Sequence, residues 1–251
     1  MTDLEMKYSI IIPYRNREEH LEALLPRLQE VFQNKNYEII ISEQGNDDNF
    51  QIAMVENIGF IHSTGDVIIL HQVDYYPSDD VSYDFDGNVT LPARKAFFLD
   101  KDNKELRPEQ DIPGGYRSFC YEINPDFYGG VIMMSREQFE AINGINPLYK
   151  GWGNEDEDLR ERFKWANIPV KRNGEGTYFC LYHGDNGDMS TKPQEYQDDF
   201  NEGQRIYSNG IKYKDVGYKS IEYTLEEIPT TIENVKWIKS TNYKVNENSF
   251  N

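Results

Sequence analysis

The sequence predicts a single α/β domain built around a central, mostly parallel sheet. Short continuous apolar runs alternate with segments of helical periodicity over residues 8–71, a pattern typical of strands joined by helical crossovers. At 251 residues the chain is long enough for one sizeable domain of this kind. The sequence contains neither an internal repeat nor a convincing linker, which favours one domain.

The first part of the sheet is predicted from an alternation of strands and helices. In chain order we expect a strand over 8–13, a helix over 21–32 with a kink at Pro26, a strand over 37–42, a helix over 50–61 and a strand over 66–71. Ligands of parallel sheets bind beyond the carboxyl ends of the strands. The predicted binding edge therefore comprises residues 13–17, 42–45 and 72–74.

Beyond residue 79 the pattern is irregular and contains fewer predicted elements. We expect a strand over 88–92, a strand over 128–134 that leads into a helix capped by Ser135 and ending near Asn143-Gly144, and a strand over 176–182. Residues 184–210 are polar and suit a mobile lid, whereas 211–251 alternate like edge strands before an Asn-rich tail.

The charge balance excludes some classes of partner. With 26 Lys plus Arg against 44 Asp plus Glu, the formal net charge is −18. This charge argues against sequence-independent binding of nucleic acid or of an anionic membrane surface. It leaves room for a phosphate-bearing ligand in a local pocket. Aromatic residues, at 14%, suit carbohydrate contacts as well as an ordinary core.

The cysteine content and the hydropathy bear on the cellular compartment. The only two cysteines, Cys120 and Cys180, imply no disulfide framework, and reduced thiols are the simpler expectation. No run of about 18 apolar residues predicts a membrane span, and the acidic N-terminus lacks the apolar core of a signal peptide. We expect a soluble, cytoplasmic protein, although a domain excised from a longer chain would look the same.

Residues 151–158 contain a Gly-Trp-Gly segment, an asparagine and four consecutive acidic residues. One interpretation is a helix start, with Asn154 and Glu157 as a capping box and a solvated Asp158 paired with Arg162. The other is a catalytic cluster, with a general base beside an aromatic ring that the glycines leave mobile. Capping does not explain the Gly-Trp-Gly segment.

Three separated segments, residues 10–17, 70–74 and 128–156, together resemble the β-1,4-galactosyltransferase family and related bacterial-type glycan synthases. The family pattern has a Pro-Phe/Tyr-Arg-Asn-Arg loop, an Asp-Val-Asp metal motif, a Tyr-Phe-Gly-Gly segment and a Trp-Gly-Trp-Gly-Gly-Glu-Asp-Asp-Asp block. The resemblance runs from about residue 8 to about residue 205 and is most specific between Phe127 and Phe163. It implies a Rossmann-like nucleotide-diphospho-sugar transferase fold, a UDP-sugar donor, a glycan acceptor, an inverting reaction, and Mn²⁺ or Mg²⁺.

The resemblance also implies which residues bind the donor. Guanidinium groups at a strand end suit a diphosphate, although loop arginines are often simply solvated. Glycines permit close backbone approach to the sugar, a role compatible with a tight turn at a strand start. Trp152 would close over the donor and exclude water. The implied donor-binding residues are Pro13, Arg15, Arg17, Phe50, Val73, Asp74, Phe127, Gly129, Gly130 and Trp152.

The implied metal ligands are Asp74, His183 and Cys180, the last at the position of a family methionine. The family's first motif aspartate is Gln72 here, and a glutamine side chain ligates hard cations less well than a carboxylate does. Two alternatives stay open. Asp74 would equally cap a turn, and the Cys180–His183 spacing is that of a zinc half-site with no second Cys/His pair to complete it.

The resemblance assigns Asp156 as the general base, with Glu155 binding acceptor or donor hydroxyls and Tyr196 keeping an aromatic platform for the acceptor. Glu195 and Asp199 replace a cation and an apolar residue of the family's acceptor segment, so N-acetylglucosamine is not inferred as the acceptor.

The leading hypothesis is therefore transfer of galactose or N-acetylgalactosamine from a UDP-sugar to a glycan hydroxyl. Gln72 and the changed acceptor residues motivate an alternative, a sugar-binding module without turnover. A third hypothesis is one transferase domain of a polysaccharide polymerase. We divide the domain into a nucleotide-binding half (1–78), a donor, acceptor and catalytic half with mobile loops (79–210), and C-terminal edge strands with a tail (211–251).

Overall fold

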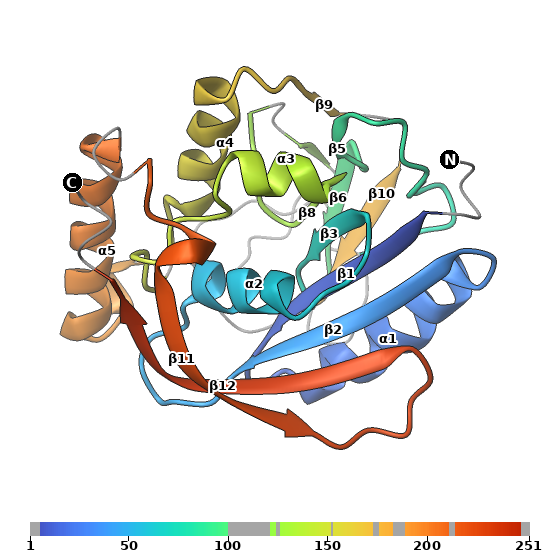
Figure 1. Cartoon of the computed structure of the whole chain (residues 1–251), viewed down its shortest axis with the longest axis horizontal. Coiled ribbons are helices and arrows are strands. Elements are labelled where there is room, and N and C mark those ends of the chain that lie inside the picture. Colours follow the sequence, from blue (N-terminus) through green and yellow to red (C-terminus); the bar gives the residue numbers. More distant parts are fainter. Residues whose placement is uncertain are drawn as a thin grey trace.

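The computed structural model describes residues 6–99, 121–123, 126–151, 153–172, 176–182, 189–210 and 214–246, and within them the strands form two sheets (Figure 1). The main sheet has the order β11 (Ile221–Ile228), β12 (Val235–Val245), β2 (Asn36–Gln44), β1 (Lys7–Tyr14), β3 (Val67–His71), β8 (Val131–Ser135), β5 (Val89–Leu91) and β9 (Val170–Arg172). The smaller sheet has the order β4 (Tyr75–Pro77), β10 (Thr177–Cys180), β6 (Lys95–Phe98) and β7 (Tyr121–Glu122). The predicted α/β fold with a central, mostly parallel sheet is confirmed.

The centre of the main sheet is parallel, as the sequence predicts. Strand β1 pairs in parallel with β2 and with β3, so that Ile10 lies opposite both Ile39 and Ile69. Helices cover both faces here, which is why these strands are continuous apolar runs instead of alternating ones. Strand β8 is antiparallel to β3 and thereby brings a second part of the chain to the carboxyl end of β3.

Helices α1 (Glu18–Phe32) and α2 (Ile52–Ile61) lie on opposite faces of the main sheet (Figure 1). Successive side chains of β1 point alternately to the two faces of the sheet. Ile10 and Ile12 pack with α1, whereas Ile11 packs with α2. Pro26 lies inside α1, at a position within the predicted helix.

Helix α3 (Arg136–Ala141) directly follows β8 and begins with the predicted Ser135 cap. The Ser135 Oγ accepts a hydrogen bond from the Gln138 backbone N–H at 3.1 Å, and the Gln138 Oε1 accepts one from the Ser135 backbone N–H at 2.8 Å. The chain then turns at Gly144, whose φ of +67° favours glycine, and continues to α4 (Glu155–Trp165).

The smaller sheet as a unit was not predicted from the sequence, although β10 lies within the strand expected over 176–182. Its strands have two to four residues each, and β4 pairs with β10 from a segment about 100 residues further along the chain. The other three strands, β4, β6 and β7, have too little periodicity to be recognised locally. The pairing places Tyr75 opposite Cys180 and so brings Asp74, the residue before β4, close to the end of β10.

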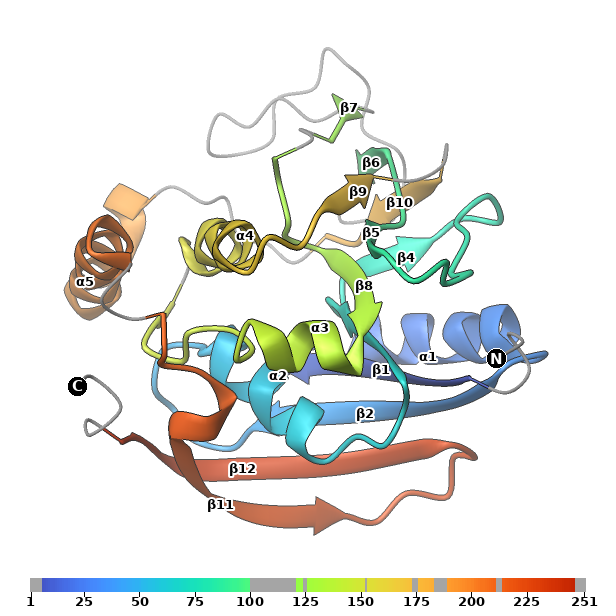
Figure 2. The ribbon, with the colours of Figure 1, turned by 45° about the horizontal axis from the view of Figure 1, so that its top comes forward.

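The C-terminal part closes one border of the main sheet, where β11 and β12 lie together (Figure 2). Strand β12 pairs in parallel with β2, and β11 is the outermost strand. Strands are thus present in the region where edge strands were expected, but only β11 is an edge strand, because β12 lies between β11 and β2. The region expected to form a lid contains the short helix η1 (Met189–Thr191) and the 15-residue helix α5 (Gln194–Ser208), and a further short helix, η3 (Tyr218–Ser220), precedes β11. Within the described ranges, no helix is both long and apolar enough to cross a membrane.

Candidate active site

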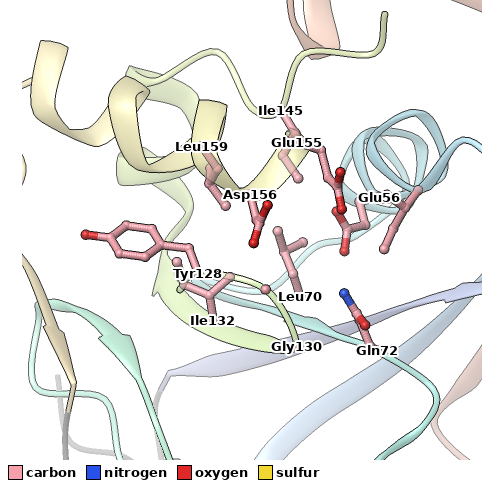
Figure 3. A pocket seen from close by; sticks show the side chains of 12 residues that line it. Glu56, Leu70, Gln72, Tyr128, Gly130, Ile132, Ile145, Glu155, Asp156 and Leu159 are labelled. Atoms are coloured by element: carbon pink, nitrogen blue, oxygen red, sulfur yellow. The ribbon is translucent and has the colours of Figure 1, made fainter. Parts of the chain in front are cut away.

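A pocket lies where the carboxyl end of β3 and the start of β8 meet helices α2 and α4 (Figure 3). It encloses about 340 Å³, part of it open to solvent. The residues that line it come from both halves of the sequence and are Ile52, Glu56, Leu70, Gln72, Tyr128, Gly129, Gly130, Ile132, Ile145, Glu155, Asp156 and Leu159. The pocket therefore lies at the sheet edge that the sequence predicts as the binding edge.

Two glycines form the floor of this pocket, and neither site has room for a side chain. A Cβ on Gly130, where φ is +87°, would lie 2.4 Å from a ring atom of Tyr75. A Cβ on Gly129 would lie 2.5 Å from the Phe127 ring and 3.3 Å from the Asp156 Oδ2. The backbone of this segment is thus exposed to the pocket, and the Gly130 carbonyl accepts a hydrogen bond from the Gln72 N–H at 2.9 Å.

The start of α4 differs from the predicted capping box. Asn154 adopts a left-handed conformation (φ +72°), and its side chain makes no capping hydrogen bond. The Asp156 Oδ1 instead accepts from the Glu157 N–H at 3.0 Å. The prediction that Asn154 and Glu157 form a capping box is wrong, because the left-handed turn removes the extended backbone that an N-cap side chain needs.

Three carboxyl groups point into the pocket, those of Asp156, Glu155 and Glu56 (Figure 3). Burial raises the pKa of Asp156, and the neighbouring Glu157 and Glu155 raise it further. Burial is also the largest cause of the raised pKa of Glu155, whose Oε2 is buried without a hydrogen-bond partner in the described structure. Carboxyl groups with raised pKa in a concave pocket are candidates for proton transfer and for binding hydroxyl groups.

Asp158 lies two residues from Asp156 but faces the core. Its Oδ2 is 2.6 Å from the Arg162 Nε, and both side chains are 1% exposed. Arg162 also donates to the carbonyls of Ile142 at 3.1 Å and Val216 at 2.7 Å. The predicted pairing is confirmed, but the predicted solvation of Asp158 is wrong. The buried guanidinium needs this carboxylate as a counter-charge, so the pair anchors the first turn of α4.

The predicted nucleotide-binding residues lie at the carboxyl end of β1 and before α2. Pro13 is inside β1, and Arg17 is the residue that precedes α1. The Arg15 guanidinium lies 5.3 Å from the centroid of the Phe50 ring and donates to the Asp48 carbonyl. The Phe50 carbonyl accepts a hydrogen bond from the Gly151 N–H at 2.9 Å, which connects this edge to the Gly-Trp-Gly segment.

Two of the three predicted metal ligands lie close together. Burial and then the Asp74 carboxylate raise the pKa of the Cys180 thiol, which is 1% exposed. The Asp74 carbonyl also accepts a hydrogen bond from the Leu181 N–H at 2.8 Å. His183 lies outside the described residues. Among the described residues no group of three metal-binding side chains is present. The Val73 side chain is buried in the core, so only its backbone is available to a donor.

Asp74 fits a divalent cation better than Cys180 does. A carboxylate is the hard ligand that Mn²⁺ and Mg²⁺ prefer, and substrate phosphates commonly complete such sites. Burial raises the pKa of the Cys180 thiol, which lies in apolar surroundings, so Cys180 would have to lose its proton in order to hold a cation as a thiolate. The described residues therefore supply one hard ligand and one soft one.

The glycines on either side of Trp152 pack against α5. A Cβ on Gly151 (φ +71°) would lie 3.2 Å from the Tyr196 Cζ, and one on Gly153 (φ +102°) would lie 3.2 Å from the Phe200 ring. Positive φ and close aromatic rings both require glycine here, whereas the sequence suggested only mobility. Trp152 itself lies outside the described residues. Tyr196, predicted to bind the acceptor, is thus beside the segment that carries Trp152.

Two family profiles match this sequence over separate regions. The profile described as the N-terminal region of glycosyl transferase group 7 matches residues 3–84, and the one described as the N-terminal domain of galactosyltransferase matches residues 117–184. The chain belongs to the β-1,4-galactosyltransferase family. The connection between β3 and β4, which contains Gln72 and Asp74, lies within the first match. Trp152 and His183 lie within the second.

Curated relatives of this family member are animal glycosyltransferases. A β-N-acetyl-D-glucosaminide β-1,4-N-acetylglucosaminyl-transferase of Lymnaea stagnalis is 35% identical over 190 residues, which are 72% of this chain and 35% of the relative. β-1,4-Galactosyltransferase 5 of Mus musculus is 31% identical over 236 residues, 87% of this chain and 56% of the relative. The chain thus matches between about a third and just over half of these relatives' length.

A solved structure of the family has the same fold as this member. The crystal structure of a mutant of Drosophila β-1,4-galactosyltransferase 7, in complex with manganese, UDP-Gal and xylobiose, superimposes with a TM-score of 0.69 at 22% identity. The match covers 96% of this chain and 94% of the solved chain. The nucleotide-diphospho-sugar transferase fold implied by the resemblance is therefore confirmed.

Sequence reasoning missed one charged residue of this family member's pocket, Glu56. It lies in α2, whose other residues are apolar except for Asn57. A single acidic residue in such a helix was the signal that could have revealed it, because a carboxyl group is rarely buried without a partner.

Proposed function

We propose that the chain is a metal-dependent, inverting glycosyltransferase that moves galactose or N-acetylgalactosamine from a UDP-sugar to a hydroxyl group of a glycan. The observation that carries the proposal is the pocket in which the largely buried Asp156 carboxyl faces the backbone of Gly129 and Gly130. Membership of the β-1,4-galactosyltransferase family and the location of this pocket at the carboxyl end of β3 support it.

In the proposed reaction, Asp156 is the general base. An acceptor oxygen forms a bond to the anomeric carbon while the bond from that carbon to the diphosphate oxygen breaks. The electron pair of the broken bond leaves with UDP, and the acceptor proton passes to the Asp156 carboxylate. The raised pKa of Asp156 makes its carboxylate a stronger proton acceptor. Attack from the face opposite the leaving group inverts the anomeric centre, and positive charge develops on the sugar ring.

The donor-binding role is proposed for residues of both halves. The nucleotide-binding part of residues 1–78 contains Pro13, Arg15, Arg17 and Phe50, and the Arg15–Phe50 contact supports their joint action on the nucleotide. Phe127, Gly129 and Gly130 would lie along the sugar, with the backbone of Val73 alongside. Trp152, next to a segment fixed by its hydrogen bond to Phe50, would close over the donor and exclude water.

The proposed cofactor is Mn²⁺ or Mg²⁺, held by Asp74 and Cys180 together with His183. The proximity of the Asp74 carboxylate to the Cys180 thiol supports this set, and a related Drosophila enzyme was crystallised with manganese and UDP-Gal. The bound cation supplies positive charge that offsets the charge of the departing diphosphate. Glu155 and Tyr196 are proposed to bind the glycan acceptor, since Glu155 lines the pocket and the Tyr196 ring lies beside Gly151.

The test is a UDP-release assay with UDP-galactose and UDP-N-acetylgalactosamine, with and without Mn²⁺. The acceptors are xylobiose, which was crystallised with a relative, and a β-N-acetylglucosaminide, which a relative's name specifies. We expect metal-dependent UDP release with at least one donor and acceptor, and a rate lower by about 10²–10⁴-fold in Asp156→Asn. Turnover by Asp156→Asn at the wild-type rate would contradict the proposal.

A non-catalytic sugar-binding module is the second candidate, favoured by the Gln72 amide in the pocket. Calorimetry that detects UDP-sugar binding without transfer or hydrolysis would select it over the enzyme.

A cytoplasmic location, proposed from the low cysteine content, is tested by fractionation of cells that express the full-length gene product.

A further inference from the structure

Glu56 is a buried carboxyl group for which the fold provides no partner. It lies in the second turn of α2, is 6% exposed and lines the pocket. In the described structure no hydrogen bond or ion pair involves its carboxyl oxygens, which face the space of the pocket. Its neighbour Asn57, in contrast, is tied down by hydrogen bonds with the Ile145 carbonyl at 2.6 Å and the Ile145 N–H at 3.1 Å.

Packing does not explain the presence of a glutamate at this position. Apolar side chains, those of Ile52, Leu70, Ile132 and Ile145, line the same pocket. A buried carboxyl group without a hydrogen bond destabilises the folded state, whereas a leucine of similar size would stabilise it. Burial, followed by the charge of Glu155, raises the pKa of Glu56 well above its usual range. An uncharged carboxyl group is both a hydrogen-bond donor and an acceptor.

The groups opposite Glu56 are also polar and point into the same space (Figure 3). The Glu155 Oε2 is buried without a hydrogen-bond partner in the described part of the chain. The Gln72 side chain extends from the end of β3 toward the Glu56 carboxyl. Asp156 and the backbone of Gly129 complete the ring of polar groups. A ligand with several hydroxyl groups would satisfy these atoms at the same time.

We infer that Glu56 is a specificity-determining residue that hydrogen-bonds a hydroxyl group of the transferred sugar and selects an uncharged hexose over a uronic acid. This inference rests on the proposed function, because it assumes that the pocket holds the sugar of a UDP-sugar. The twelve residues that line the pocket include three carboxylic acids and neither lysine nor arginine. A sugar carboxylate would therefore add a fourth acidic group with no lysine or arginine among the lining residues to pair with it.

The experiment measures binding of four probes by calorimetry in the presence of Mn²⁺: UDP, UDP-galactose, UDP-N-acetylgalactosamine and UDP-galacturonic acid. The proteins are the wild type, Glu56→Leu, Glu56→Gln and the control Glu22→Leu, which changes an exposed glutamate of α1. Thermal melting accompanies each variant. Glu56→Leu is expected to melt no lower than the wild type, since it removes a buried carboxyl group without a partner.

We expect the wild type to prefer the better-bound neutral sugar to the uronic acid by at least about tenfold. Glu56→Leu is expected to lose about tenfold in affinity for the neutral sugar, to keep its affinity for UDP, and to lose most of the preference. Glu56→Gln keeps a donor and an acceptor and is expected to stay within about threefold of the wild type. Glu22→Leu is expected to match the wild type for all four probes.

Each contrary result identifies what is wrong. If the wild type binds UDP-galactose and Glu56→Leu keeps the wild-type preference, the inference is wrong and the proposed function stands. A loss in Glu56→Gln as large as in Glu56→Leu would overturn the hydrogen-bond assignment. Wild-type protein that binds none of the UDP-sugars would overturn the proposed function and this inference with it.

Discussion

Asp156 and Asp158 are two residues apart in the first turn of α4, yet their surroundings differ completely. Asp158 faces the core and is paired with Arg162 at 2.6 Å, whereas Asp156 faces the pocket beside Glu155 and Glu56. On the core side Arg162 supplies a counter-charge for Asp158, although burial still raises the pKa of Asp158, whereas the pocket side accumulates carboxyl groups with no lysine or arginine among the lining residues. The comparison teaches that one helical turn both stabilises the fold and keeps a reactive group in an unfavourable environment, a combination typical of functional sites.

The largest expected effect is a loss of activity when Asp156, on the pocket side of α4, is replaced. Asp156→Asn keeps the shape of the side chain and removes its ability to accept a proton. We expect kcat to fall by about 10²–10⁴-fold, with the fold intact. UDP release under saturating donor measures the rate, and circular dichroism checks the fold. An Asp156→Asn enzyme with near-normal kcat would show that the two aspartates do not differ in the way proposed.

The second largest expected effect is a loss of stability when Asp158, on the core side of α4, is replaced. Asp158→Ala leaves the Arg162 guanidinium buried without its counter-charge, so we expect a loss of about 3–5 kcal/mol in the free energy of unfolding. Urea denaturation measures it. The control is Glu161→Ala on the same helix, where the Glu161–Lys164 pair is solvent-exposed and is worth at most about 1 kcal/mol. Equal losses in the two variants would mean that burial does not distinguish these pairs.

A third prediction concerns the pocket floor. Gly130→Ala places a Cβ 2.4 Å from the Tyr75 ring in a backbone of positive φ, so we expect a loss of about 2–4 kcal/mol in stability and weaker binding of the UDP-sugar. Gly87→Ala is the matched control, because Gly87 has nearly the same φ, +88°, with open space around its Cα. It reports backbone strain alone, about 1 kcal/mol. Similar losses of stability in Gly130→Ala and Gly87→Ala would contradict the interpretation that the clash with Tyr75 destabilises the first variant.

The smallest expected effect is the contribution of Asp156, on the pocket side of α4, to the pH dependence of stability. The folded-state pKa of Asp156 is raised, so the folded protein holds a proton that the unfolded chain releases above about pH 4. Stability therefore falls as the pH rises from there toward the folded-state pKa. Asp156→Asn removes this contribution and is expected to be more stable than the wild type by about 1–2 kcal/mol at pH 8, with little difference at pH 4.

Urea denaturation of the wild type and Asp156→Asn across this pH range measures the difference. Activity has the opposite slope, since the base must lose its proton, so we expect kcat to rise with pH over the same window. A stability difference that does not change with pH would contradict the raised pKa of Asp156.

Much of the fold could be predicted because it depends on local periodicity. The apolar runs that became β1, β2 and β3, and the Ser135 cap of α3, are local patterns with one physical interpretation. Of the smaller sheet only β10 was predicted as a strand, since the other strands are short and β4 pairs with the distant β10. The conformation of Asn154 was also missed, because its residue type suits both an N-cap and a left-handed turn.

The sequence by itself determined the parallel centre of the sheet, its binding edge and the family, since apolar runs and motifs are properties of the linear chain. Only the tertiary structure decided which carboxyl groups share one environment. Asp156 and Glu155 meet Glu56 across the pocket from a helix about 100 residues earlier, while Asp158 turns to Arg162. The physical reason is that burial and neighbouring charge, which set the state of an acid, depend on contacts between distant segments.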